Sequence, residues 1–128
     1  MAQGAATKTI GKLAQAVAAL WIVNVWFLRF NKDTGYRGGD ATNMKEEFDV
    51  YGLSETQMYG VGAMKVGLAG TMLVGLAVPR LTRPASIGLA GFMVGAVAMH
   101  AKAGDPPKRY LPAVSVLSLA TASAVLSD

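Results

Sequence analysis

The chain has 128 residues, of which 52% are hydrophobic and only 16% are charged, and its mean hydropathy is +0.36. Soluble domains carry about 25% charged residues, so this composition argues against an ordinary water-soluble fold and predicts a surface that lies mostly in lipid. The net charge of +4 is dispersed along the chain, which argues against nucleic-acid binding, and the absence of cysteine excludes disulfides and thiol chemistry.

Four apolar segments follow one another along the chain and are expected to be membrane-spanning helices. A helix needs about 20 apolar residues to cross a bilayer, with roughly 17–25 as the usual range. Prolines stand near the ends of the segments, where helices stop and start. The spans are expected at about residues 13–30, 58–78, 84–100 and 110–126 of a single membrane domain, residues 1–128. The predicted fold class is therefore all-α, a polytopic membrane four-helix bundle.

Two alternative interpretations of these segments are weaker. The first segment could be a cleaved signal peptide, but bulky residues, 25–28, stand where cleavage requires small ones. The third and fourth segments could be buried helices of a soluble bundle, but residues 85–99 contain only Ser86 as a polar side chain. A helix that is apolar on all sides favours contact with lipid.

A long polar loop, residues 31–57, separates the first two spans. Its first part is rich in turn-forming residues. Its second part, Thr42–Tyr51, is predicted to form a short amphipathic helix with Thr42 as its N-cap and with Met44 and Phe48 on one face. This helix is expected to lie along the membrane surface or against a partner.

Small residues recur three or four positions apart within the spans, a spacing that lets two helix backbones approach closely. Packing between helices of this bundle is the favoured interpretation, and docking onto another subunit is the alternative. The helix-packing residues predicted in this way are Ala63 and Gly67 in the second span, Gly91, Gly95 and Ala98 in the third, and Ala14 and Ala18 in the first.

Lys65 is a charged residue about one third of the way into the second span, where a lysine costs at least about 2.5 kcal/mol. It could serve a proton relay, bind an anion or pair with an acid of another chain, and it is a candidate cofactor-binding residue. The favoured interpretations are structural. The long side chain could extend to the nearer membrane interface, or pair with a loop acid such as Glu55.

His100 is the single histidine and closes the third span. A neutral imidazole could bind a metal, a haem or the magnesium of a chlorophyll. Because no second ligand stands near it in the sequence, no metal site is predicted. Capping the negative end of a helix is the favoured role, and His100 as a pigment ligand is the alternative.

Other polar residues have expected structural roles. Gln15 and Asn24, at membrane depth in the first span, are expected to form hydrogen bonds between helices. Asp105 precedes two prolines and is expected to cap a helix. The chain has no nucleophile elbow, phosphate loop, HExxH motif or pair of intramembrane carboxylates, so it is not predicted to be an enzyme.

Several charged loop phrases combine with the four-span layout. They are Arg29-Phe30-Asn31-Lys32, Tyr36-Arg37-Gly38-Gly39, Lys45-Glu46-Glu47-Phe48, Tyr51-Gly52-Leu53, Met64-Lys65-Val66, Val78-Pro79, Met99-His100-Ala101-Lys102 and Asp105-Pro106-Pro107-Lys108-Arg109. Together they resemble the DoxX-like family over about residues 20–126. The resemblance implies a small four-helix membrane protein with a link to quinone chemistry, and it assigns no catalytic residues.

The leading functional hypothesis is a non-catalytic accessory subunit of a larger photosynthetic or electron-transfer complex, in a thylakoid or bacterial inner membrane. Its partners would be membrane lipid and other membrane subunits, and chlorophyll, carotenoid, quinone or lipid could occupy grooves between its helices. One alternative is a quinone-linked redox membrane protein of DoxX type, with Lys65 and His100 near the quinone headgroup. A small transporter or lipid-binding bundle is the other.

Overall fold

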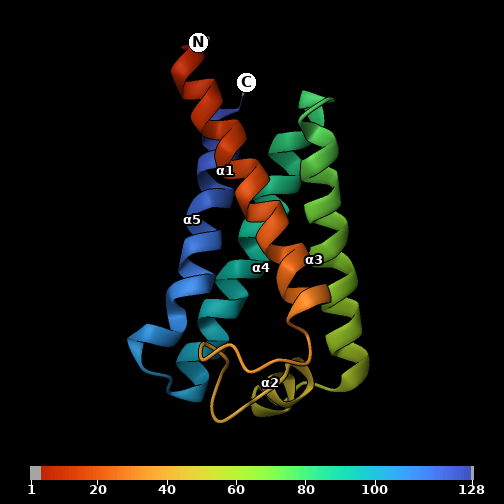
Figure 1. Cartoon of the computed structure of the whole chain (residues 1–128), viewed down its shortest axis with the longest axis vertical. Coiled ribbons are helices and arrows are strands. Elements are labelled where there is room, and N and C mark those ends of the chain that lie inside the picture. Colours follow the sequence, from red (N-terminus) through yellow and green to blue (C-terminus); the bar gives the residue numbers. More distant parts are fainter. Residues whose placement is uncertain (1–3, 128) are drawn as a thin grey trace.

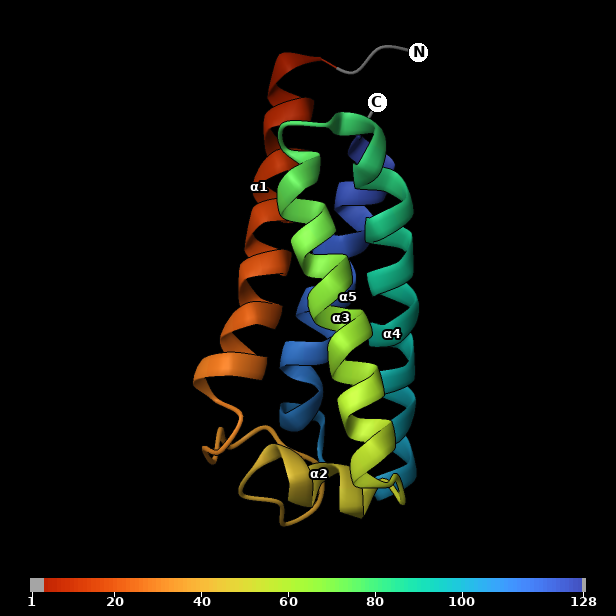
Figure 2. The same ribbon diagram turned by 90° about the vertical axis from the view of Figure 1, so that its right-hand side faces the viewer.

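The computed structural model describes residues 4–127, which fold into four long helices and a short one. The long helices lie side by side as a bundle (Figures 1 and 2), which confirms the predicted all-α class. In chain order the elements are α1 (Ala5–Val23) with a π-helical turn (Asn24–Leu28), α2 (Met44–Val50), α3 (Glu55–Gly75), a 3-10 turn (Pro79–Leu81), α4 (Thr82–Ala103), a second 3-10 turn (Pro107–Tyr110) and α5 (Leu111–Leu126).

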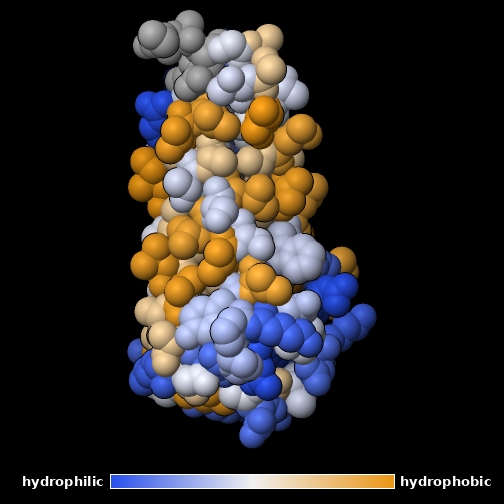
Figure 3. Space-filling view, turned by 90° about the vertical axis from the view of Figure 1, so that its left-hand side faces the viewer, coloured by the Kyte–Doolittle hydropathy of each residue, from blue (hydrophilic) through white to orange (hydrophobic). Residues whose placement is uncertain are grey.

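Within residues 4–127, four helical stretches are long and apolar enough to cross a membrane: Ala5–Leu28, Glu55–Gly75, Pro79–Ala103 and Pro107–Leu126. Figure 3 shows hydrophobic side chains over the shaft of the bundle and hydrophilic ones gathered at one end. Each helical stretch begins several residues before the span expected from hydropathy, because polar residues continue the helix beyond the apolar run.

The two ends of the bundle differ in what covers them. One end, here called the loop end, carries residues 29–54, including α2, and the connection between α4 and α5. The opposite end, here called the terminal end, carries both ends of the described chain and the turn between α3 and α4 (Figures 1 and 2).

Small residues of α1 lie at close contacts between helices of the bundle. Ala14 and Ala18 are buried where α1 packs on α3 and α5, as their spacing predicted. At Gly11, an added Cβ would lie 3.0 Å from the Cβ of Leu126, so α1 and α5 approach closely near the terminal end. Alanine and glycine are thus the residues that let the first and last helices meet.

The small residues of α3 and α4 lie elsewhere. Ala63, Gly67, Gly91, Gly95 and Ala98 are all exposed on the outside of the bundle. A Cβ added at any of these three glycines would have no neighbouring atom within 4 Å. Packing between helices of this chain is therefore the wrong interpretation for these five residues. The spacing identifies a face of the helix, but it does not show whether that face turns toward the inside or the outside of the bundle.

Hydrogen bonds between side chains join the helices inside the bundle. The Gln15 amide nitrogen of α1 donates to the Met72 carbonyl oxygen in α3 at 2.6 Å and to the Thr82 hydroxyl of α4 at 2.9 Å, which confirms the role expected for Gln15. The Ser86 and Ser123 hydroxyls join α4 to α5 at 2.8 Å. Asn24 behaves differently from expectation, because it begins the π-helical turn and its side chain bonds to no partner within residues 4–127.

The polar loop contains the predicted short helix, but the cap differs. The α2 helix spans Met44–Val50, and the Asn43 side chain caps it by accepting from the Glu46 amide at 2.9 Å. Thr42, the expected N-cap, instead donates from its amide and hydroxyl to the Glu46 carboxylate, at 2.8 and 2.7 Å. With Asn43 as the cap, Met44 is the first residue of the helix and its side chain is buried in the bundle. The Met44 amide then donates to the Phe30 carbonyl oxygen at 2.8 Å.

Candidate ligand site at the loop end

A cavity of about 410 Å³ lies at the loop end of the bundle. This volume is within the range of ligand pockets in proteins, roughly 300–1,000 Å³. Lys65 and His100, the two candidate site residues found in the sequence, both line it. Most of the other lining residues are apolar or aromatic, and the polar ones are few. The lining residues besides these two are Trp21, Ile22, Val25, Trp26, Arg29, Thr34, Tyr36, Arg37, Met44, Glu47, Phe48, Tyr51, Leu53, Val61, Met93, Ala96, Met99, Pro112, Ala113 and Val116.

The π-helical turn at the end of α1 forms one wall of the cavity. π-helical turns are rare in proteins, and a large share of those that exist lie at functional sites. This one carries Trp26, whose ring packs on Phe30 and Phe48 with centroids 6.0 Å away in each case. On α3, a Cβ added at Gly62 would lie 2.4 Å from the Trp26 ring, so only glycine at this position leaves room for the indole.

Replacing Gly62 with alanine is expected to displace the Trp26 ring and to destabilise the protein by about 1–3 kcal/mol, as overpacking does. Gly67→Ala on the same helix is the matched control, because an added Cβ there meets no atom within 4 Å. Unfolding in detergent, followed by tryptophan fluorescence, measures both variants. Equal losses of stability for the two variants would contradict the close packing of Trp26 on Gly62.

Lys65 lies ten residues into α3, about 15 Å from the loop end of that helix. Helical side chains lean toward the N-terminus of their helix, which for α3 is the loop end, and Lys65 lines the cavity there. Its Nζ forms no hydrogen bond or ion pair with any side chain or carbonyl of residues 4–127. The ion pair with Glu55 expected from the sequence is absent from residues 4–127, and the acid that lines the cavity with Lys65 is Glu47 of α2. A lone ammonium group in a mostly apolar cavity favours a ligand that carries an acceptor oxygen.

His100 is 5% exposed and lies near the loop end of α4. Its ring packs between those of Tyr51 and Tyr110, with centroid distances of 6.0 and 5.4 Å. The Nδ1 atom lies 2.7 Å from Oδ2 of Asp105. Among residues 4–127 no group of three metal-binding side chains comes together, and His100 meets a single carboxylate.

Asp105 does not cap a helix, so that expectation was wrong. Neither the 3-10 turn Pro107–Tyr110 nor α5 has a side-chain cap. The chain reverses at Gly104, whose φ of +71° lies in the left-handed region that favours glycine, and this reversal carries Asp105 back beneath His100. The position of Asp105 before two prolines suggested a cap. The reversal that moves Asp105 away from a capping position depends on the C-terminal geometry of α4, which the sequence did not show.

The Asp105 carboxylate joins the α4–α5 connection to the polar loop. Its Oδ1 accepts from the Gly39 amide at 2.8 Å and lies 3.6 Å from the Arg109 guanidinium. Burial acts to raise the pKa of Asp105. The hydrogen bonds from Gly39 and His100, together with the charges of His100 and Arg109, outweigh this effect and hold that pKa below its usual value of 3.8. Asp105 is therefore a charged carboxylate at neutral pH.

This lowered pKa predicts an acid-dependent loss of stability. A carboxyl group with a lower pKa in the folded state stabilises the fold above its unfolded pKa of 3.8, and the contribution falls as the pH drops through the folded value. Asp105→Asn is expected to be less stable than the wild type at neutral pH, with the difference narrowing below about pH 4. Thermal unfolding in detergent across a pH series measures this, and parallel profiles for the two proteins would contradict it.

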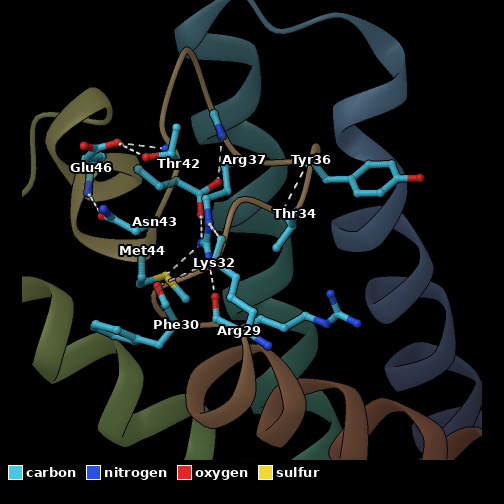
Figure 4. Close-up of polar contacts among 12 residues, drawn as sticks. Arg29, Phe30, Lys32, Thr34, Tyr36, Arg37, Thr42, Asn43, Met44 and Glu46 are labelled. Atoms are coloured by element: carbon cyan, nitrogen blue, oxygen red, sulfur yellow. Dashed lines mark hydrogen bonds and ion pairs between the residues drawn. The ribbon is translucent and has the colours of Figure 1, made fainter.

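Arg37 lines the cavity and forms polar contacts with several segments of the polar loop (Figure 4). It is 4% exposed, and its guanidinium donates to the carbonyl oxygens of Lys32 at 2.9 Å, of Phe30 at 3.4 Å and of Arg29. It also forms an ion pair with Glu47 at 3.1 Å. One side chain thus ties the end of the first span, the turn after it and α2 into a single cover.

Glu47 extends the same network toward His100. Its second carboxylate oxygen accepts from the Gly38 amide at 2.8 Å and from the Tyr51 hydroxyl at 2.9 Å. Burial, followed by the nearby charge of Glu47, raises the pKa of Tyr51, so the phenol stays protonated and donating. The Tyr51 ring in turn packs edge-on against His100. The cover of the cavity is therefore joined to its histidine by hydrogen bonds to Glu47 and by the packing of the Tyr51 ring.

A second cavity, of about 250 Å³, lies at the terminal end. Lys8, Lys12 and Gln15 line it, and the Gln15 amide nitrogen is already engaged by α3 and α4. No candidate cofactor-binding residue from the sequence lies there. The loop-end cavity, which both Lys65 and His100 line, is therefore the candidate site.

The sequence model of the DoxX-like family matches residues 35–123 of the chain. The chain belongs to the DoxX-like family. The match includes Arg37, Lys65, His100 and Asp105, and it ends within α5. No curated protein and no solved structure matches the chain. With its four apolar helices, this DoxX-like protein is a multi-pass integral membrane protein.

Several residues of the site could not be recognised as site residues from the sequence. Trp26 and Gly62 meet across two helices, and neither is unusual within an apolar run. Arg37 and Glu47 look like ordinary loop charges until the loop folds. The loop phrases that resemble the DoxX-like family do contain Arg37, Glu47 and Tyr51, so the resemblance indicated the right segments without giving them roles.

Proposed function

We propose that this DoxX-like protein is a non-catalytic binding protein for a quinone-class molecule, whose ring occupies the loop-end cavity. One observation carries the proposal: Lys65 and His100, from different helices, line the same aromatic cavity. A quinone has a flat ring with oxygens on its edge and an apolar tail. Aromatic walls suit the ring, and the few polar groups suit its oxygens.

The charge of the cavity supports the same ligand class. Arg37 is neutralised by Glu47, whereas the Lys65 ammonium has no partner among the described residues. A quinone oxygen would accept a hydrogen bond from Lys65, and it would do so without placing a full negative charge in the bundle. The ligand thus offers an acceptor to a cavity-lining donor that the described residues leave without one.

Tryptophan fluorescence provides a direct test, because both tryptophans of the chain, Trp21 and Trp26, line the cavity. The protein in lipid nanodiscs is titrated with a decyl-substituted benzoquinone, which is expected to quench the fluorescence saturably at one molecule per chain. Lys45→Met, which removes an exposed loop lysine, is expected to leave the titration unchanged. Linear, unsaturable quenching equal to that of free tryptophan in the same nanodiscs would contradict the proposal.

A second candidate function is that of an accessory subunit of a larger photosynthetic or electron-transfer complex. The outward small residues favour it, because Gly67, Gly91 and Gly95 leave open space on α3 and α4 that a helix of another subunit would fill. Native gel electrophoresis of mildly solubilised membranes tests this function. Co-migration with a large complex, lost in the Gly91→Leu/Gly95→Leu variant, is the expected result, and migration as a lone chain would contradict it.

A further inference from the structure

We infer that Asp105 is a positioning residue that fixes the His100 tautomer, so that His100 presents a hydrogen-bond acceptor to the cavity and the site prefers the reduced, hydroxyl-bearing form of its ligand. This inference rests on the proposed function for the identity of the ligand. The statement about Asp105 and His100 concerns the protein alone.

The first step concerns the Nδ1 atom of His100. It lies 2.7 Å from Oδ2 of Asp105, and that side chain is 2% exposed. A carboxylate accepts hydrogen bonds and has none to donate. A neutral His100 must therefore carry its proton on Nδ1, which leaves Nε2 without one.

The second step concerns where Nε2 points. It forms no hydrogen bond with residues 4–127, yet no buried side-chain nitrogen or oxygen of that range is without a partner. Nε2 must therefore reach an accessible surface. His100 as a whole is 5% exposed, and it is one of the residues that line the cavity, so we assign the accessible surface of Nε2 to this cavity. In neutral His100 the unprotonated Nε2 atom thus faces the cavity, where it can accept a hydrogen bond.

The third step combines the two polar groups. Lys65 can only donate a hydrogen bond, and a neutral His100 in this tautomer can only accept one at Nε2. A hydroquinone satisfies both, because one hydroxyl donates to Nε2 while the oxygen of the other accepts from Lys65. A quinone offers acceptors alone, so its carbonyl oxygen would face the lone pair of Nε2. The cost of leaving the polar Nε2 atom unpaired in the complex with the quinone would make the site prefer the hydroquinone.

The environment of Asp105 predicts what an amide at this position would do. Its Oδ1 faces the Gly39 amide and the Arg109 guanidinium, which are both donors. In Asp105→Asn the amide oxygen would stay on that side, and the amide nitrogen would then face His100. Because an amide NH2 group donates, Nδ1 would lose its proton and Nε2 would gain one. The variant should thus present a donor to the cavity and favour the oxidised ligand.

The single histidine of the chain makes the tautomer measurable. The protein, labelled with ¹⁵N-histidine in lipid nanodiscs, is followed by NMR over a pH series, and the tautomer of the neutral ring is read from the two nitrogen shifts. A bare Nε2 in the wild type and a bare Nδ1 in Asp105→Asn are expected. Asp33→Asn, at an exposed loop carboxylate that accepts from the Gly35 amide, should match the wild type. A wild-type ring protonated on Nε2 would overturn the inference, whether or not the variant folds.

Ligand binding gives the second readout. Calorimetric titration with the decyl-substituted benzoquinone and with its hydroquinone should show that the wild type favours the hydroquinone by about tenfold, as expected for one hydrogen bond to a buried group. In Asp105→Asn the ratio should reverse. An unchanged ratio in a folded variant would overturn the inference but leave the proposed function standing. If neither form binds, the proposed function fails, and the NMR result alone decides the role of Asp105.

Discussion

Replacing Arg37 with methionine is expected to lower the free energy of unfolding by at least about 2 kcal/mol, the largest loss among the substitutions considered for the polar loop. The buried guanidinium pairs with Glu47 and donates to three backbone carbonyl oxygens. Methionine fills a similar volume but donates nothing, so Glu47 and the carbonyl groups would lose their partner. Leaving one member of a buried ion pair alone costs more than the pair itself contributes.

Thermal unfolding in detergent measures this loss, and limited proteolysis should show cleavage within residues 29–54 before the helices open. Arg80→Met, at an exposed position of the terminal end, is the matched control and should stay within about 0.5 kcal/mol of the wild type. The double variant Arg37→Met/Glu47→Gln should recover part of the stability, because it removes the isolated charge while the amide oxygen can still accept from the Gly38 amide and the Tyr51 hydroxyl. A double variant less stable than Arg37→Met would contradict the role given to the ion pair.

Replacing Lys65 with methionine is expected to change stability and ligand binding in opposite directions. The Lys65 ammonium lies within a membrane span and has no partner among residues 4–127. Its removal should therefore raise the stability of the ligand-free protein by about 1 kcal/mol. The same change should weaken binding of the benzoquinone by at least about tenfold, because a hydrogen bond from a charged donor contributes roughly 1.5–3 kcal/mol.

This pair of measurements separates a binding role of Lys65 from a structural one. If the side chain only extends toward the membrane interface, methionine would stabilise the protein and leave quenching by the benzoquinone unchanged. Lys45→Met, on the exposed side of α2, is the matched control for the loss of one positive charge from the loop end. A loss of stability in Lys65→Met would contradict the account, because it would mean that the ammonium group is stabilised by contacts within the protein.

The helices and their membrane character could be predicted because both depend on local sequence. An apolar run of about 20 residues predicts a span whatever surrounds it. Gln15 is a polar side chain within such a run. It could be assigned a hydrogen bond between helices because lipid offers it no partner. Lys65 and His100 were likewise conspicuous, since each is an ionisable side chain in or beside a span.

The geometry of the site could not be predicted because it depends on which helix faces meet. The spacing of Gly91 and Gly95 identified a smooth face on α4, but nothing in the sequence showed that this face turns outward. Gly62, an equally small residue on α3, turned out to be the one that accommodates Trp26. The contact between His100 and Asp105 required the chain to reverse at Gly104.

The most direct test of the ligand site is photoaffinity labelling with an azido-benzoquinone in lipid nanodiscs, followed by peptide mass spectrometry. We expect the labels to be concentrated on the lining residues of the cavity, foremost Trp26, Tyr51 and Met99, and to be competed by excess unlabelled benzoquinone. Labels spread over the outward faces of α3 and α4, and insensitive to the competitor, would contradict this expectation, because the probe would then be reporting only the lipid around the bundle.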